Sequence, residues 1–224
     1  MRNRKTLLPL LLFVLLRFDS SAQTGEARSE TLLMENSGFV NVRTLDSSIA
    51  VRLMYATDDN FTGERLYGDL REAYLRKDAA LKLAAAQKHL KAIEPSFRLA
   101  VRDAARPQSA QLKMWEKVRN TPMRKYVSSP ARVSMHTYGV AVDVTILDGE
   151  GNYLDMGTEV DSLDPLSEPR REAEFLAAGR LTRTQTGNRA LLKKVMNKAG
   201  FRGIANEWWH FEACSRAEAE KGIK

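Results

Sequence analysis

The chain has 224 residues, of which 43% are hydrophobic and 28% are charged, and its formal net charge is +7. This length suits one sizeable domain with a hydrophobic core of its own. Its basic residues are scattered along the chain, which argues against nucleic acid as a partner. A single cysteine, Cys214, excludes an intramolecular disulfide.

The N-terminal residues resemble a secretory signal peptide. Three basic residues within the first five precede an apolar run from Leu7 to Leu16, and the small residues Ser20-Ser21-Ala22 follow. The run is shorter than the roughly 20 residues that span a bilayer, which favours a cleaved signal over a membrane anchor. We predict a signal peptide over residues 1–22 and a mature domain over 23–224. The protein is then exported, to a bacterial periplasm, without stable membrane insertion. Removing four basic residues and one acidic residue leaves the mature chain at +4.

The first half of the mature chain mixes strand and helix patterns. Residues 23–36 are polar and are expected to be a loose N-terminus, whereas the alternation over 39–54 predicts short strands. Residues 55–68 are rich in Asp, Asn and Gly and predict a structured loop. A helix ending before Pro95 follows, because apolar residues recur every three or four positions. They are Leu75, Ala79, Leu83, Ala86, Leu90 and Ile93.

Two strands with a helix between them come next. Residues 97–103 alternate apolar and polar side chains and predict a half-buried strand. This strand leads to Pro107 and then to a helix over 109–118. In a second strand, over 140–147, the valines share one face and Asp143 faces the other way.

The last third begins with a polar, turn-rich excursion over residues 148–187, which we place beside the active site. A short amphipathic helix over 188–201 follows, stopped by Gly200. Residues 206–213 are expected to form the last strand. Strands and helices mix without strict alternation, which favours a single compact α+β domain with a largely antiparallel sheet flanked by helices.

The first chemical motif contains a histidine and an aspartate seven residues apart. In an unbroken strand this odd separation would send His136 and Asp143 to opposite faces. Gly139 can adopt a turn conformation that folds His136 back towards the strand. Asp143 stands among valines, where a buried carboxylate needs a partner or a metal ion. A loop-capping role for His136 and an arginine partner for Asp143 are the open alternatives.

The second motif is Glu207-Trp208-Trp209-His210. His210 stands among large aromatic residues, a dry setting that suits a zinc ligand, and the tryptophans are expected to belong to the core. Two histidines and one aspartate leave the fourth tetrahedral position of a zinc ion open to water, as in catalytic sites. If the chain turns before the strand, Glu207 reaches that open side and can serve as the base.

Arg106 is a third candidate. It follows the strand over 97–103 and precedes Pro107, which restricts it to an extended backbone. A guanidinium there can stabilise an oxyanion in the transition state. A surface arginine is an equally good interpretation of Arg106 taken alone.

Taken together, these stretches resemble the D-alanyl-D-alanine dipeptidases, zinc peptidases related to DD- and LD-carboxypeptidases. The pattern S-x-H-x-x-G-x-A-x-D is met from Ser134 to Asp143, and E-W-W-H from Glu207 to His210. Tyr55 to Gly63 matches Y-A-T-x-D-N-F-T-G, an element characteristic of the dipeptidase branch. D-x-x-R-P is met from Asp103 to Pro107, and M-G-[ST]-x-x-D from Met156 to Asp161.

The resemblance implies a fold of the Hedgehog and DD-peptidase type, with the zinc site on the sheet. It implies one Zn²⁺ per chain and a small dipeptide as substrate. The resemblance also assigns zinc binding to His136, Asp143 and His210. It assigns acid-base catalysis to Glu207 and transition-state stabilisation to Arg106. Tyr55 and Asp161 match positions that hold the free amino terminus of the substrate, and Ser134 is expected to line the pocket.

The chain departs from the family pattern at a few positions. Ala105 and Val160 stand where aromatic residues are usual, and the segment after Asp164 matches poorly. These changes concern the shape of the pocket and therefore the choice of dipeptide. A carboxypeptidase for longer cell-wall peptides and a non-catalytic peptidoglycan-binding module are the alternative functions. The amine-binding pair argues against the first, and the presence of both Glu207 and Arg106 against the second.

Overall fold

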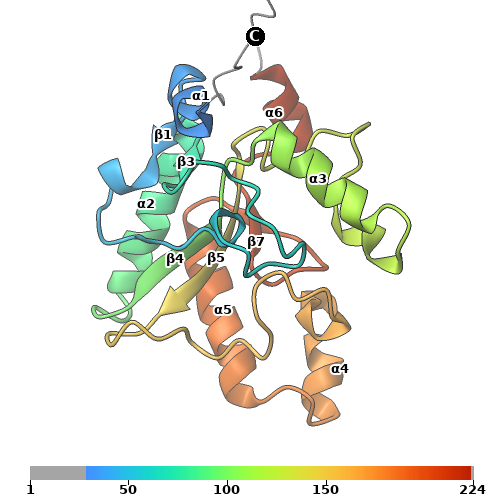
Figure 1. Ribbon diagram of the computed structural model, residues 1–224. Helices are drawn as coiled ribbons and strands as arrows, with labels where there is room; N and C mark the ends of the chain where they lie inside the picture. The colour runs from blue at the N-terminus through green and yellow to red at the C-terminus, as the bar shows by residue number, and fades with distance from the viewer. Residues whose placement is uncertain (1–28, 223–224) are drawn as a thin grey trace, which may run out of the picture.

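A computed structural model of the chain describes residues 29–222 (Figure 1). The predicted signal peptide, residues 1–22, lies outside this range, so the boundary with a domain at 23–224 stays a prediction. The elements in chain order are α1 (Glu30–Asn36), β1 (Val40–Asn41), β2 (Ala50–Val51), η2 (Met54–Ala56), β3 (Tyr74–Leu75), α2 (Lys77–Lys91), β4 (Arg98–Asp103), α3 (Gln108–Val118), η3 (Pro122–Tyr126), β5 (Ala141–Leu147), α4 (Glu172–Ala177), α5 (Arg183–Lys198), β6 (Arg202–Gly203), β7 (His210–Glu212) and α6 (Arg216–Lys221). Further short 3₁₀ helices cover Val42–Thr44, Pro165–Ser167 and Pro169–Arg171.

A five-stranded sheet in the order β2-β4-β5-β7-β6 forms the centre of the described domain. Its only parallel pair within residues 29–222 is β2 with β4, and the other neighbours run antiparallel. A separate two-stranded sheet pairs β1 with β3. The prediction of an α+β domain with a largely antiparallel sheet flanked by helices is confirmed. The closer likeness to the Hedgehog type stays a prediction.

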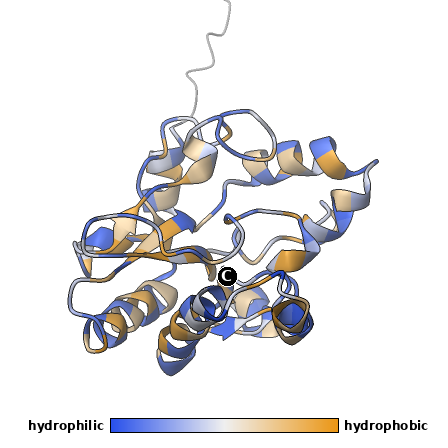
Figure 2. Ribbon diagram, turned by 90° about the horizontal axis from the view of Figure 1, so that it is seen from below, coloured by the Kyte–Doolittle hydropathy of each residue, from blue (hydrophilic) through white to orange (hydrophobic). Residues whose placement is uncertain are grey.

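The central strand β5 is buried along its whole length. It lies between β4 and β7, and helices α2 and α5 pack against each other on one side of the sheet (Figures 1 and 2). The hydrophobic residues of both helices belong to the same core as the valines of β5. Asp143 was expected to face away from the valines as a buried carboxylate. It is buried together with Thr145, so further chain covers that face of the strand as well.

Several helix and strand boundaries differ from the prediction. The segment expected to be loose contains helix α1, whose first turn is capped by Ser29 and by Asp69, a carboxylate 39 residues away that accepts from the Glu30 amide. Helix α5 begins before the predicted residue 188, because Thr182 and Gln185 form a capping box. The last strand covers only His210–Glu212, and the preceding residues of the predicted strand, 206–209, are irregular and bent. Helices α4 and α6 had no predicted counterpart.

Membrane-spanning helices are absent from the part of the chain that the structure describes: no helix there combines the length and the apolar character that a bilayer requires. The apolar run at 7–16 lies outside the described residues.

Candidate metal centre and active site

Strand register brings three chemically important residues into one row across the sheet. Asp143 on β5 is paired with His210 on β7. On its other side Asp143 is paired with Asp103 on β4, after a register shift between Val101 and Asp103. Directly opposed residues on antiparallel strands lie close together, so these side chains reach one another without any loop movement.

A tight turn brings His136 to the same place. Gly139 has a φ of +69°, and its amide donates to the carbonyl oxygen of His136 at 2.8 Å. The Ser134 Oγ accepts from the His136 amide at 3.3 Å. The predicted fold-back at Gly139 is therefore present, and Ser134 stabilises the turn as well as lining the cavity.

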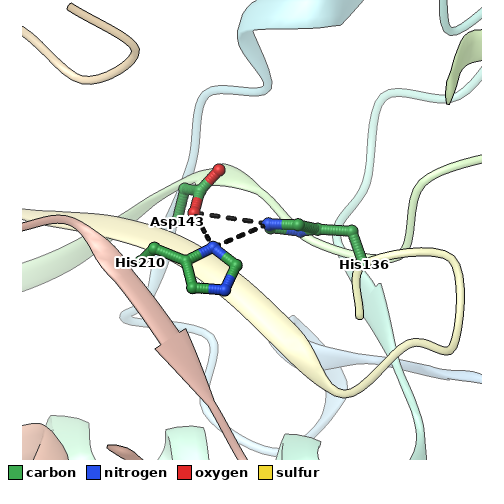
Figure 3. A group of neighbouring side chains, drawn as sticks. All are labelled: His136, Asp143 and His210. Carbon is green, nitrogen blue, oxygen red and sulfur yellow. Dashed lines mark hydrogen bonds and ion pairs between the residues drawn. The ribbon is translucent and has the colours of Figure 1, made fainter. Parts of the chain in front are cut away.

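His136, Asp143 and His210 form a buried group that can hold a metal ion (Figure 3). Asp143 Oδ1 is 3.0 Å from His210 Nδ1 and 3.4 Å from His136 Nε2, and the two ring nitrogens are 3.1 Å apart. Bonds of about 2.0–2.1 Å to one tetrahedral zinc ion would separate neighbouring ligand atoms by roughly 3.3 Å. The spacing and the two-imidazole, one-carboxylate donor set therefore both fit zinc.

Neighbouring groups orient the two imidazoles towards this centre. His136 Nδ1 lies 2.9 Å from the carbonyl oxygen of Ala104, which can only accept. Nδ1 therefore carries the hydrogen, and the lone pair of Nε2 faces Asp143 and His210. For His210 the roles are reversed, because Nδ1 faces the centre and Nε2 lies 3.6 Å from Glu212 Oε1. Such outer partners set the tautomer of a metal-binding histidine.

The electrostatics of the site suit cation binding and proton transfer. Burial alone would raise the pKa of Asp143, but His136 and His210 hold it well below its usual range. Burial would lower the pKa of His210, but the carboxylates of Asp143 and Glu212 raise it to about 10 in the metal-free protein. Burial raises the pKa of Glu207 to about 8. A cation bound by His136, Asp143 and His210 would lower the pKa of Glu207 towards neutrality, where a proton acceptor works best.

Glu207 stands in an irregular, bent segment before β7, which is the condition under which it was expected to reach the centre. Its Oε2 lies 3.9 Å from His210 Nδ1, the nitrogen that faces the centre. The carboxylate thus borders the candidate metal site without replacing any of the three ligands. Trp208 and Trp209, which follow it, are buried in the core as expected.

Arg106 is buried and held by three side chains. Its Nε donates to Asp103 Oδ2 at 3.0 Å, and its Nη1 donates to Gln111 Oε1 at 2.8 Å. Tyr67 donates a hydrogen bond to the other oxygen of Asp103, and the guanidinium lies over the ring of Tyr55. Burial would lower the pKa of Arg106, but the charge of Asp103 raises it well above the usual value. The surface-arginine interpretation is therefore wrong.

Tyr55 and Asp161 meet although they are 106 residues apart in sequence. Tyr55 belongs to η2, and its hydroxyl donates a hydrogen bond to Asp161 Oδ2. Asp161 has a φ of +62°, the single positive value among the non-glycine residues 29–222. Burial, followed by the charge of Asp143, raises the pKa of Asp161 to about 6. Burial also keeps Tyr55 protonated by raising its pKa.

One cavity of about 630 Å³ joins these groups. All eight residues singled out from the sequence line it: Tyr55, Arg106, Ser134, His136, Asp143, Asp161, Glu207 and His210. No residue of α2 or α5 contributes to its wall, so it lies on the side of the sheet away from these helices. The predicted excursion over 148–187 does supply part of the wall, through Asp161 and Leu163.

Three supporting residues were not predicted from the sequence. Asp103 belongs to a motif that we recognised, and its charge three residues before Arg106 was an available signal. Glu212 lies two residues after His210, on the same face of a strand, so alternation could have identified it. Gln111 had no signal of its own, because its amide bridges Arg106 to the Ser128 carbonyl through tertiary contacts alone.

Comparison with known proteins agrees with this geometry. The family profile described as D-ala-D-ala dipeptidase matches residues 35–222. The chain is 35% identical to the D-alanyl-D-alanine dipeptidase of Escherichia coli (strain K12), over 80% of this chain and 86% of that protein. It is 31% identical to the D-alanyl-D-alanine dipeptidase of Streptomyces coelicolor, over 77% and 90%, and 29% identical to that of Enterococcus faecalis, over 80% and 92%.

Proposed function

This chain belongs to the D-alanyl-D-alanine dipeptidase family, and from that premise we propose that it hydrolyses D-alanyl-D-alanine-type dipeptides to free amino acids with one zinc ion. The observation that supports this best is the single cavity, in which a buried His-Asp-His group lies beside a carboxylate, a buried arginine and a tyrosine–aspartate pair.

His136 Nε2, Asp143 Oδ1 and His210 Nδ1 would hold the zinc ion. When bound there, zinc would supply Lewis-acid polarisation of the scissile carbonyl and a lower pKa for a bound water. The protein contributes a dry setting and preset ligand orientations, because Ala104 and Glu212 face the outer nitrogens of the two imidazoles.

Glu207 and Arg106 carry out the remaining chemistry of hydrolysis. Glu207 accepts a proton from the water whose oxygen adds to the carbonyl carbon. It returns that proton to the leaving nitrogen as the C–N bond breaks, so both products leave with balanced charge. Arg106 stabilises the negative charge that develops on the carbonyl oxygen. Asp103 and Gln111 position the guanidinium in advance.

Asp161 and Tyr55 would bind the free amino group of the substrate. An ammonium ion between the Asp161 carboxylate and the Tyr55 hydroxyl satisfies a carboxylate whose burial is otherwise costly. A substrate extended on its amino side loses this ion pair. The pair therefore favours dipeptides over longer cell-wall peptides.

The cellular setting follows from the N-terminal pattern. Export to the periplasm, directed by residues 1–22, would give the enzyme access to D-alanyl-D-alanine released from the cell wall. Turnover or recycling of cell-wall peptides is the role that we propose.

D-alanine release from D-Ala-D-Ala by the purified mature protein tests the function. We expect release that a chelator abolishes and that added zinc restores. An N-acetylated dipeptide and a longer peptide ending in D-Ala-D-Ala serve as matched substrates, and we expect both to be poor. Efficient cleavage of the longer peptide would favour a carboxypeptidase instead. Zinc binding without cleavage of any substrate would favour a peptidoglycan-binding module.

A further inference from the structure

One stretch of the cavity wall is strongly basic, in contrast to the pair of Tyr55 and Asp161 proposed to bind the amino group. Residues 117–142 contain five lysines and arginines and no aspartate or glutamate. Three of them line the cavity: Arg124, Lys125 and Arg132. The carboxyl groups that line the cavity belong to Asp143, Asp161, Glu207 and Glu212, and none of these residues lies in this stretch.

This basic wall (residues 124–132) is anchored at its middle and just past its end. The Gln111 side chain joins Arg106 to the Ser128 carbonyl, donating to it at 2.9 Å. Just beyond the wall, Arg216 on α6 donates to the Val133 carbonyl at 2.8 Å. The wall therefore has a defined position relative to the residues proposed for catalysis.

The three cations that line the cavity are not neutralised by the protein. Arg124, Lys125 and Arg132 are exposed, and within residues 29–222 none of them pairs with a carboxylate. Lys125 lies over the ring of Tyr126, and this contact leaves its charge uncompensated. By contrast, Lys117 and Arg119, on the same stretch but outside the cavity, pair with Glu64 and Glu116.

The cavity also has room beyond a dipeptide with two methyl side chains. Its volume of about 630 Å³ falls in the range of roughly 300–1,000 Å³ that buries drug-sized ligands. Because Asp161 and Tyr55 are proposed to bind the amino end of the substrate, the spare room and the positive charge remain for its carboxyl-terminal residue.

We propose that the basic wall selects dipeptides whose second residue carries an acidic side chain, such as D-Ala-D-Glu or D-Ala-D-Asp. This inference rests on the proposed dipeptidase function and extends its substrate class. The side-chain carboxylate would gain from partly screened attraction to Arg124, Lys125 and Arg132, an effect that depends on salt concentration.

The test compares D-Ala-D-Glu with D-Ala-D-Gln, which has the same shape and no side-chain charge. In the wild type we expect kcat/KM to favour the acidic dipeptide by roughly fivefold or more at low salt, as for a few partly exposed ion pairs. The preference should shrink as salt is added. The triple variant Arg124→Gln, Lys125→Gln, Arg132→Gln should bring the ratio close to one, and Arg132→Gln alone should reduce it partly.

Arg119→Gln is the matched control, because it removes a positive charge from the same stretch outside the cavity. It should keep the wild-type ratio. A wild-type ratio of one or below, or a ratio that the triple variant leaves unchanged, would overturn the proposal. If the enzyme cleaves D-Ala-D-Ala while the ratio is one, this inference fails and the dipeptidase function stands.

A binding measurement covers the case in which no dipeptide is cleaved. Calorimetric titration of the zinc-loaded full chain with the same two dipeptides then reports the selectivity directly. Tighter binding of D-Ala-D-Glu that disappears in the triple variant would support the basic wall although the proposed activity had failed. Equal binding of both dipeptides would reject it.

Discussion

The candidate metal centre and the proposed amine-binding pair lie in one cavity but are held in different ways. Asp143 and His210 face each other on paired strands, and His136 is fixed by a turn with its own backbone hydrogen bonds. Tyr55 and Asp161 come from a 3₁₀ turn and a loop, and one side-chain hydrogen bond joins them. The first region is positioned by the backbone and the second by side-chain contact.

This difference separates the two tasks of the site. Metal binding requires ligand atoms within a few tenths of an ångström, which strand pairing and a tight turn provide. Substrate binding tolerates small adjustments, which loops allow. We therefore expect substitutions in the metal centre to abolish nearly all activity. Substitutions in the amine-binding pair should reduce it only in part.

The largest effect is expected for His210→Ala. Loss of one imidazole should remove zinc, and with it several kcal/mol of transition-state stabilisation, so turnover should fall by roughly a thousandfold or more. Metal content per chain and D-alanine release check this together. His89→Ala, on helix α2 away from the cavity, is the control and should keep both. A His210 variant with full zinc content would contradict the proposed ligand set.

Glu207→Gln separates catalysis from metal binding. The amide keeps the shape of the side chain but cannot accept a proton, so we expect kcat to fall by roughly 10²–10⁴-fold. Zinc content should not change, because Glu207 lies beside the three ligands and is not one of them. A near-normal rate in this variant would show that another group acts as the base.

Asp161→Asn tests the side-chain-held region. Removing its charge should raise KM for D-Ala-D-Ala by roughly tenfold to a hundredfold, the worth of a hydrogen bond to a charged group, with a smaller change in kcat. The wild type should discriminate strongly against the N-acetylated dipeptide, and the variant should do so much less. Unchanged discrimination would mean that the amino group is recognised elsewhere.

Zinc affinity should rise with pH. In the metal-free protein the pKa of His210 is raised to about 10, so a proton occupies the site at neutral pH and must leave when the metal binds. The affinity should therefore increase by about tenfold per pH unit for this proton between neutrality and pH 9. Competition with a chelator of known affinity, corrected for its own protonation, measures the slope. A flat profile would mean that His210 is already neutral.

The smallest effect concerns the turn that positions His136. A Cβ at residue 139 would lie 2.9 Å from Phe39 Cζ, in a backbone conformation of positive φ. Gly139→Ala should lower the free energy of unfolding by roughly 1–3 kcal/mol. Gly179→Ala is the matched control, because its φ is +68° and nothing lies within 4 Å of the added atom. Urea denaturation should show the larger loss for Gly139. Equal losses in the two variants would mean that backbone strain alone, and not the close contact with Phe39, causes the destabilisation.

Local patterns predicted many elements and failed at their ends. Helices α2 and α3 and strands β4 and β5 were predicted within a few residues, because their apolar periodicity reflects which side faces the core. Helix α1 was missed although Ser29 is a local capping residue, because its further support from Asp69 and from burial of Met34 is tertiary. Strand β7 is shorter than predicted, because pairing with β5 begins only at His210.

The sequence by itself determined which residues are candidates for the chemistry. Asp143 was recognisable because a carboxylate among valines is costly in a core without a partner, and His136, Glu207 and His210 were recognisable from their neighbours and from the motifs that contain them. Only the tertiary structure decided how they meet. The pairing of Asp103, Asp143 and His210, the Tyr55–Asp161 contact and the anchoring of the basic wall join residues far apart along the chain. Such contacts depend on strand register and loop packing, which are set by the whole fold and leave no local pattern in the sequence.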